Sequence, residues 1–188
     1  MTEASEFSAE WMADLRRRLD RPIVLVGLMG SGKSTIGQRL AGMLGVAFAD
    51  SDREIEKAAA RTVAEIFAEF GEPYFRDGER RVIARLLDSG SGVIATGGGA
   101  FVDAETRALV LERAIAVWLD ADIETLVTRT ARRDSRPLLK DGDPREILTR
   151  LHDLRAPHYA EAQIRIETND LPHHLTAMTI LEAVHQWL

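Results

Sequence analysis

The sequence predicts an α/β fold in which a five-stranded parallel sheet is flanked by helices. Three observations support this expectation. Short apolar runs of strand length recur along the chain, stretches with helical periodicity separate them, and the first run leads directly into a glycine-rich loop. Strands separated by helices pair in parallel through right-handed crossovers. The 188 residues fall in the size range of one domain, so a single domain over residues 1–188 is expected.

The expected elements can be placed in order along the chain. Residues 7–19 carry apolar side chains at helical spacing and predict a helix within an N-terminal extension, residues 1–21. The first strand is the apolar run from Ile23 to Val26, whose β-branched content is typical of a strand buried on both faces. A helix follows the glycine-rich loop and is expected to end at Gly45. The other strands are expected at residues 46–49, 93–96, 115–119 and 164–166.

Two intervals between strands are longer than a simple crossover requires. Residues from about 53 to 90 hold at least two helices, one of which begins at a capping-box sequence, Thr62 to Glu65. Residues from about 131 to 145 form a basic loop that ends at Asp143 and Pro144, an N-cap and first-turn pair. Insertions of this kind often carry function, so we expect a small acceptor-binding lobe in the first interval and a lid in the second.

Composition excludes several classes of protein. The 24 basic and 30 acidic side chains give a net charge of -6, which disfavours a nucleic-acid partner. The chain has no cysteine, so disulfides and thiolate catalysis are excluded, as expected for a cytoplasmic protein. No apolar run approaches the roughly 20 residues that span a bilayer, and no membrane partner is expected.

The strongest functional signal is the segment from Gly27 to Ser34, which matches the pattern G-x-x-x-x-G-K-[ST] between a predicted strand and a predicted helix. In such a loop the backbone N–H groups and the helix N-terminus face phosphate oxygens. Lys33 is expected to meet the β- and γ-phosphates, and Ser34 to bind Mg²⁺ through its hydroxyl. The residues expected to contact the nucleotide here are Gly30, Ser31, Gly32, Lys33, Ser34 and Thr35.

Further polar residues follow the second and third predicted strands. Open α/β sheets bind ligands at the carboxyl ends of their strands. Of the two nearby carboxylates, Asp50 is expected to hold Mg²⁺ through water, and Asp52 to orient an acceptor hydroxyl and receive its proton. A surface turn that caps the next helix is the alternative. The glycines at 97–99 allow a substrate to approach the backbone, or form a flexible turn.

Arg76 is the candidate for binding an acidic acceptor. Arginine is the natural partner of a carboxylate, and Glu79 lies three residues further on, where it can brace the guanidinium. The alternative is a surface salt bridge of little energetic value. The same two interpretations apply to Arg132, Arg133, Arg136 and Arg155.

Taken together, these motifs resemble those of the shikimate kinases from Ile23 to Leu188. The resemblance rests on the phosphate loop with Thr35-Ile36-Gly37 after it, on Phe48-Ala49-Asp50-Ser51-Asp52, on Gly97-Gly98-Gly99, on Arg136-Pro137-Leu138-Leu139 and on Arg155-Ala156-Pro157-His158-Tyr159. The match is weakest around residues 168–170, where a basic residue would be expected beside the adenine.

The resemblance implies a role for each of these residues. Shikimate would be bound by Asp52, Arg76, Gly98, Gly99 and Arg155, with Phe67 and Phe75 lining the acceptor pocket. Both phenylalanines also fit a core-facing helical pattern, which is the alternative. Arg136 would be the lid arginine, and Arg129 would pack against adenine. Lys33, Asp52 and Arg136 would act in the transfer itself.

The expected activity is Mg²⁺-dependent transfer of the γ-phosphoryl group of ATP to the 3-hydroxyl of shikimate by a monomer. Other kinases of similar architecture, for gluconate or nucleoside monophosphates, are the nearest alternatives. A nucleotide-binding switch without an acceptor is a third, although the Asn-Lys-x-Asp segment typical of guanine specificity is absent.

Overall fold

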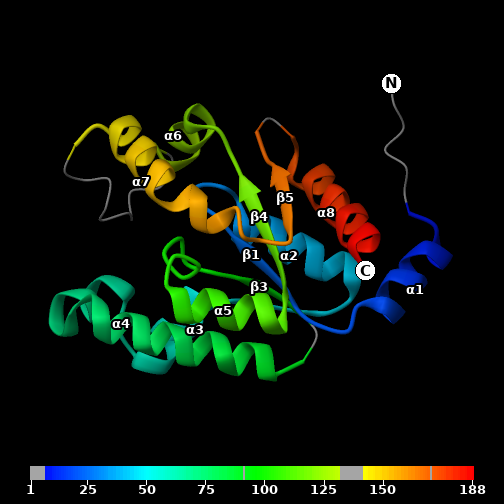
Figure 1. The fold of residues 1–188 in the computed structure, drawn as a ribbon, viewed down its shortest axis with the longest axis horizontal. Helices are drawn as coiled ribbons and strands as arrows, with labels where there is room; N and C mark the ends of the chain where they lie inside the picture. The colour runs from blue at the N-terminus through cyan, green and yellow to red at the C-terminus, as the bar shows by residue number, and fades with distance from the viewer. Residues whose placement is uncertain (1–6, 91, 132–141, 170) are drawn as a thin grey trace.

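The computed structural model describes residues 7–90, 92–131, 142–169 and 171–188 and contains one five-stranded parallel sheet (Figure 1). The strand order is β2-β3-β1-β4-β5, with β1 at the centre. This confirms the predicted sheet. The strands are β1 Ile23–Val26, β2 Ala47–Asp50, β3 Gly92–Ala95, β4 Ile115–Asp120 and β5 Ile164–Glu167.

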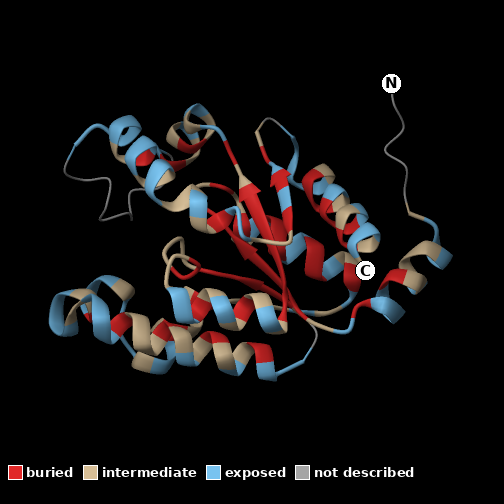
Figure 2. Cartoon of the chain, in the orientation of Figure 1, coloured by how far each residue is buried: buried red, intermediate tan, exposed pale blue. Residues whose placement is uncertain are grey.

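The strands differ in how far they are buried. All four residues of β1 are buried, because β1 pairs with β3 on one side and β4 on the other and both of its faces are covered by helices. At the edge of the sheet, β5 alternates buried and exposed residues. Figure 2 shows the buried residues concentrated along the central strands.

Helices cover both faces of the sheet (Figure 1). One apolar core joins α1, α2 and α8 to side chains such as Leu25 and Val117, and a second joins α4, α5, α6 and α7 to side chains such as Val24 and Ala116. The helices are α1 Ala9–Arg18, α2 Lys33–Leu44, α3 Ser51–Ala59, α4 Val63–Asp88, α5 Ala104–Arg113, α6 Ile123–Ala131, α7 Pro144–Tyr159 and α8 His173–Trp187.

The interval between β2 and β3 forms a lobe made of α3 and α4. The predicted capping box is present, since Thr62 Oγ1 accepts from the Glu65 N–H at 3.2 Å and Glu65 Oε2 accepts from the Thr62 N–H at 2.7 Å. Helix α4 is broken at Gly71, whose φ of 79° and ψ of 174° are not helical. A third, smaller apolar cluster, which includes Ile66 and Phe75, holds this lobe together.

The interval expected to form the lid is helical at both of its described ends. Helix α6 includes Ala131, and α7 begins at Pro144 with the Asp143 side chain accepting from the Arg145 N–H at 2.9 Å, as the sequence predicts for its first turn. Residues 132–141, and with them Arg136, lie outside the described residues. Among the described helices, none combines the length and apolar character needed to cross a membrane.

The N-terminal helix α1 packs against the main body of the protein. Leu15 is fully buried in the core shared with α2 and α8. Arg16 donates to the carbonyl oxygens of Met43 at 2.9 Å and Leu44 at 2.8 Å, at the carboxyl end of α2. These carbonyls have no partner within their own helix, so the guanidinium caps α2.

We predict that Leu15→Ala lowers the free energy of unfolding by about 2 to 4 kcal/mol, because it leaves a cavity in the core shared by α1, α2 and α8. Urea denaturation followed by circular dichroism measures this. Leu154→Ala is the matched control, since that side chain is 63% exposed and its loss should cost less than about 0.5 kcal/mol. Equal effects of the two substitutions would mean that α1 is not part of the cooperative unit.

Candidate active site

The glycine-rich loop between β1 and α2 adopts the conformation that its glycines permit. Gly27, Gly30 and Gly32 have φ values of 135°, 87° and 97°, which disfavour residues with side chains. A Cβ at Gly27 would lie 2.6 Å from the carbonyl oxygen of Leu119, so this turn also requires glycine for space. Gly32 is the N-cap of α2 and provides no side-chain cap, which leaves the first N–H groups of the helix for an anion.

Lys33 extends back along this loop and is buried. Its Nζ donates to the carbonyl oxygens of Gly27 at 2.8 Å and Leu28 at 2.7 Å, and lies 3.4 Å from Ser31 Oγ. A buried ammonium group needs such partners, because transfer of an unpaired charge out of water is costly. The structure therefore holds one positive charge against the inner face of the loop, where phosphate groups are expected.

Ser34 and Asp50 come from different elements and lie together beside the loop. Ser34 Oγ donates to Asp50 Oδ2 at 2.6 Å, which joins the first turn of α2 to the end of β2. The other oxygen, Asp50 Oδ1, accepts from the Asp52 N–H at 3.2 Å and caps α3. The cap that the sequence left as an alternative is therefore present, and the same carboxylate also faces the phosphate loop.

These oxygens fit a magnesium ion. Mg²⁺ prefers hard oxygen ligands and usually keeps several waters, so one hydroxyl, one carboxylate and the phosphates of a nucleotide are a sufficient set. Within the residues that the structure describes, no group of three His, Cys, Asp or Glu side chains forms a ready-made metal cage. The donor set matches a metal that arrives with its nucleotide.

Asp52 points toward the glycine triplet that follows β3. A Cβ at Gly97 would lie 2.7 Å from Asp52 Oδ1, so only glycine fits beside this carboxylate. Burial raises the pKa of Asp52, the Asp50 carboxylate raises it further, and the positive charges of Lys33 and Arg76 oppose the shift. A carboxylate with a raised pKa is a better proton acceptor than an exposed aspartate.

Arg76 lies on α4 between two glutamates. Its Nη1 donates to Glu79 Oε2 at 2.5 Å, while its Nε and Nη2 lie 3.3 and 3.2 Å from Glu72 Oε1. Glu79 is only 1% exposed, and burial raises its pKa to about 7 against the opposing effect of Arg76. The sequence predicted that Glu79 pairs with Arg76, but not that Glu79 is buried. Because Glu79 is buried, this pair is not one of the weak salt bridges found on protein surfaces.

The glycine triplet brings α4 and α7 close to the end of β3. A Cβ at Gly99 would lie 2.8 Å from Cζ of Arg76, and one at Gly98 would lie 3.3 Å from Nη1 of Arg155. Gly99 therefore has to lack a side chain where the Arg76 guanidinium crosses it. The Gly97 N–H donates to Ser51 Oγ at 3.2 Å, which ties the triplet to the start of α3.

A pocket of about 590 Å³ opens where these elements meet, a size within the range of small-molecule sites. Arg76, Gly99 and Arg155, which the sequence assigned to one acceptor site, all line it. They come from α4, the loop after β3 and α7. The full lining is Glu72, Pro73, Arg76, Asp77, Arg80, Gly99, Val102, Asp103 and Arg155.

Phe67 and Phe75 are not among the residues that line this pocket. Their rings pack 4.5 Å apart in the third apolar cluster, which is the core-facing alternative that the sequence left open. The guanidinium carbon of Arg76 lies 5.3 Å from the centroid of the Phe75 ring. The Phe75 ring therefore helps to hold the Arg76 guanidinium in place through a cation–π contact.

Tyr159, for which the sequence predicted no role, lies four residues after Arg155 on the same face of α7. Its hydroxyl donates to the carbonyl oxygen of Gly98. Burial raises the pKa of Tyr159 to about 12, so the hydroxyl stays protonated and remains a donor at neutral pH. The i, i+4 spacing from Arg155 was the signal that could have identified it.

On the other side of the phosphate loop, Arg129 of α6 donates to the carbonyl oxygens of Thr168 at 2.9 Å and Asn169 at 2.6 Å. It thereby connects α6 to the segment after β5, where adenine contacts were expected. The sequence lacks a basic residue at 168–170, but Cδ2 of His173 would lie 3.8 Å from a Cβ at Gly32. Burial lowers the pKa of His173, and the charges of Arg129 and Arg39 lower it further.

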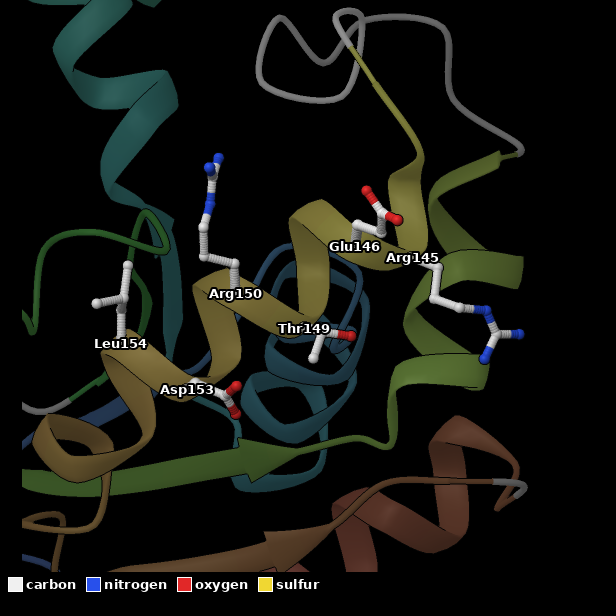
Figure 3. Close-up of a pocket in the computed structure, with 6 residues that line it drawn as sticks. All are labelled: Arg145, Glu146, Thr149, Arg150, Asp153 and Leu154. Atoms are coloured by element: carbon white, nitrogen blue, oxygen red, sulfur yellow. The ribbon is translucent and has the colours of Figure 1, made fainter.

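A second hollow lies along α7 and is lined by Arg145, Glu146, Thr149, Arg150, Asp153 and Leu154 (Figure 3). All six residues come from one helix, and none of them is a candidate site residue. Charges of both signs alternate along this surface. The candidate site residues that line a pocket are instead found between α4, α7 and the glycine triplet.

Comparisons with known proteins agree with this arrangement. Residues 29–185 match the family model described as shikimate kinase. A shikimate kinase from Novosphingobium aromaticivorans is 57% identical, over 99% of this chain and 98% of that relative. The structure of a shikimate kinase from Acinetobacter baumannii in complex with shikimate is 39% identical, with a TM-score of 0.87, over 93% of this chain and 97% of that one. A gluconokinase from Sinorhizobium meliloti, at 17% identity and a TM-score of 0.59 over 90% of this chain and 94% of that one, shares the fold alone.

The raised pKa of Glu79 predicts a pH-dependent contribution to stability. The folded protein holds this proton up to a pH of about 7, whereas the unfolded chain releases it near the ordinary glutamate value of 4.5. The stabilising effect of the proton is therefore complete below about pH 4.5 and is lost as the pH rises through about 7, a change on the order of 3 kcal/mol.

Glu79→Gln should therefore gain stability relative to wild type by about that amount between about pH 4.5 and pH 8. Chemical denaturation at a series of pH values measures this difference. Glu72→Gln removes the exposed carboxylate on the same arginine and should show a much smaller change with pH. A constant difference between Glu79→Gln and wild type would show that Glu79 is ionised throughout this range.

Proposed function

This chain belongs to the shikimate kinase family, and we propose that its site transfers the γ-phosphoryl group of ATP to the 3-hydroxyl of shikimate. The family resemblance that the sequence predicted is confirmed. The observation that carries the proposal is the meeting of Asp52, Arg76 and the glycine triplet directly beside the phosphate loop. A phosphoryl donor and an acidic, hydroxyl-bearing acceptor can be held side by side there.

We assign the nucleotide to the loop from Gly27 to Ser34 and the first turn of α2. Lys33 is already on the inner face of this loop, so it can exchange carbonyl oxygens for β- and γ-phosphate oxygens with a small movement. His173 lies beside Gly32, and Arg129 binds the carbonyl oxygen of Asn169. We assign adenosine to this side of the loop. Magnesium, held by Ser34 and through water by Asp50, would neutralise charge on the phosphates.

We assign the acceptor to the pocket between α4 and α7. Arg76 and Arg155 reach it from two helices and suit a carboxylate, which arginine binds through paired N–H groups. Gly98 and Gly99 have no side chains, so the guanidinium groups of Arg155 and Arg76 can lie against the backbone at this wall of the pocket. Asp52 does not line this pocket, but it lies beside Gly97 and feels the charges of both Lys33 and Arg76, so we assign it to the reacting hydroxyl.

In this arrangement the chain acts mainly by positioning. Phosphoryl transfer passes through a loose transition state, so alignment of the acceptor oxygen with the γ-phosphorus matters more than strong base catalysis. Asp52 accepts a hydrogen bond from the acceptor hydroxyl and takes its proton as the new P–O bond forms, while ADP leaves with the electrons of the broken P–O bond. The expectation that Arg136 contacts the transferring group stays a prediction, because this residue lies outside the described residues.

We also propose that the enzyme is a monomer. A cytoplasmic location is proposed as well, in keeping with the absence of cysteine. Gluconate kinase activity and a switch without an acceptor remain the competing hypotheses. The arginine pair and the glycine wall favour a compact acidic ring over a flexible sugar acid, because a rigid acceptor loses less conformational freedom in such a pocket.

An acceptor panel tests the proposed function. Purified protein with Mg²⁺ and ATP is offered shikimate, quinate, gluconate and nucleoside monophosphates, and ADP release is followed. We expect rapid turnover only with shikimate. Lys33→Ala should lower that turnover by roughly 100-fold or more while the circular dichroism spectrum is unchanged. Comparable turnover with gluconate, or none with any acceptor, would contradict the proposal.

The arginine pair gives a second test. Arg76→Lys or Arg155→Lys should lower kcat/KM for shikimate by roughly 30-fold, the equivalent of about 2 kcal/mol, because lysine cannot replace the guanidinium fork. Affinity for ATP should be nearly unchanged. Arg85→Lys, on the same helix and paired with Glu54 at 3.2 Å, is the control and should have little effect.

The amide analogue of shikimate, which lacks the negative charge, separates two explanations. Wild type should lose most of its advantage over the lysine variants with this analogue. Equal losses with both acceptors would mean that the arginines support the fold and do not bind the carboxylate.

A further inference from the structure

We propose that Glu79 takes up a proton when the acceptor binds, so that acceptor affinity depends on the protonation of this buried carboxyl group. The inference rests on the proposed function, because it requires an acceptor carboxylate at Arg76. Glu79 would then be a positioning residue whose charge state changes with each binding event, and not only a fixed brace for the arginine.

Glu79 and the acceptor share one cation, Arg76. Arg76 Nη1 is bound to Glu79 Oε2 at 2.5 Å, and the same guanidinium lines the acceptor pocket at Gly99. The Arg76 side chain is 22% exposed, and its Nε and Nη2 are paired with Glu72, which is 64% exposed and which an acceptor carboxylate can displace. A carboxylate that binds at Nε and Nη2 competes with Glu79 for the same positive charge.

Other charged groups also face Glu79. Asp52 on α3 and Asp103 before α5 both carry negative charge near it, and Arg76 is the cation that offsets them. Asp52 Oδ1 and Glu79 Oε1 would lie 2.7 and 3.0 Å from the same point, a Cβ at Gly97, so the two oxygens are within about 6 Å of each other. Arg155, on α7, faces the same pocket and is assigned to the acceptor.

Glu79 has one carboxyl oxygen, Oε1, that can take the proton. Glu79 Oε1 is buried and has no hydrogen-bond partner within the described part of the chain, whereas Oε2 accepts from Arg76. A proton on Oε1 therefore leaves the hydrogen bond at Oε2 intact. Protonation removes the buried negative charge and keeps the hydrogen bond to Arg76. The ionised form is costly here, because a buried carboxylate oxygen without a hydrogen bond has lost its hydration.

The direction of the effect follows from charge. Burial already holds the pKa of Glu79 at about 7, and a bound acceptor carboxylate would raise it further by repulsion and by sharing Arg76. The acceptor's own carboxyl group is ionised in this range, since ordinary carboxylic acids titrate near pH 4. Binding is thus coupled to proton uptake above about pH 7, and affinity falls as the pH rises through that window.

Isothermal titration calorimetry of the full chain with shikimate tests the proposal. The binding enthalpy is measured at one pH in two buffers with different ionisation enthalpies, and the difference gives the number of protons taken up. We expect a substantial fraction of one proton near pH 7.5 and almost none near pH 5.5, where Glu79 is protonated in both states. Each unit by which binding raises the pKa of Glu79 weakens binding by roughly tenfold at high pH relative to low pH.

Two matched variants identify the group responsible. Glu79→Gln should abolish the uptake and make shikimate affinity nearly independent of pH. Glu72→Gln makes the same chemical change in a carboxylate that is 64% exposed and bonded to the same guanidinium, and it should retain the uptake. Carbon-13 NMR of labelled glutamate side chains in wild type, with and without shikimate, follows Glu79 directly and uses Glu79→Gln only for assignment.

The outcomes are distinct. Shikimate binding without proton uptake in wild type, or uptake that persists in Glu79→Gln, overturns the inference and leaves the proposed function standing. Uptake that is lost in Asp52→Asn but retained in Glu79→Gln also overturns it, because the proton then belongs to Asp52. Failure of wild type to bind shikimate would refute the proposed function, and this inference with it.

Discussion

Parallel pairing of the strands places every carboxyl end on one edge of the sheet, and the site depends on this constraint. The phosphate loop follows β1, Asp50 ends β2, and the glycine triplet follows β3, three segments that are distant in sequence. Strand register brings them to the same level, since Leu25 pairs with Ala95 and Ala95 pairs with Asp50. The remaining elements add to this edge, with α4 and α7 supplying the arginines from opposite sides of the triplet.

A second constraint is that charges at this edge are partly buried and therefore have to be paired. Lys33 is held by carbonyl oxygens, Asp50 by Ser34, and Arg76 by Glu79. Lys33 and Asp50 can exchange these partners for ligand groups without leaving an unpaired charge, whereas the buried Glu79 has to stay on Arg76. The same low-dielectric surroundings that make the pairs necessary also raise the pKa of Asp52 and Glu79.

Periodicity was sufficient to predict the fold, and its small errors have local causes. The second strand was expected at 46–49 but begins at Ala47. The Val46 N–H donates to the carbonyl oxygen of Ala41 as part of the C-terminal cap of α2 at Gly45, so it is not free for the sheet. The family resemblance, and not spacing alone, implied that Arg76, Gly99 and Arg155 serve one acceptor site, and the three residues line one pocket. Neither the resemblance nor the spacing could predict the burial of Glu79, the bond from Tyr159 to Gly98 or the place of His173, because each depends on packing between elements that are far apart in sequence.

Helix α2 is secured at both ends, by the phosphate loop at its start and by Arg16 of α1 at its end. The phosphate loop is therefore attached to a helix, α2, whose carboxyl end is bound to α1. Much of the disorder that a glycine-rich segment could retain is removed during folding, before any nucleotide arrives. Helix α1 can in this way influence how tightly the phosphates are held, through the entropy of preorganisation.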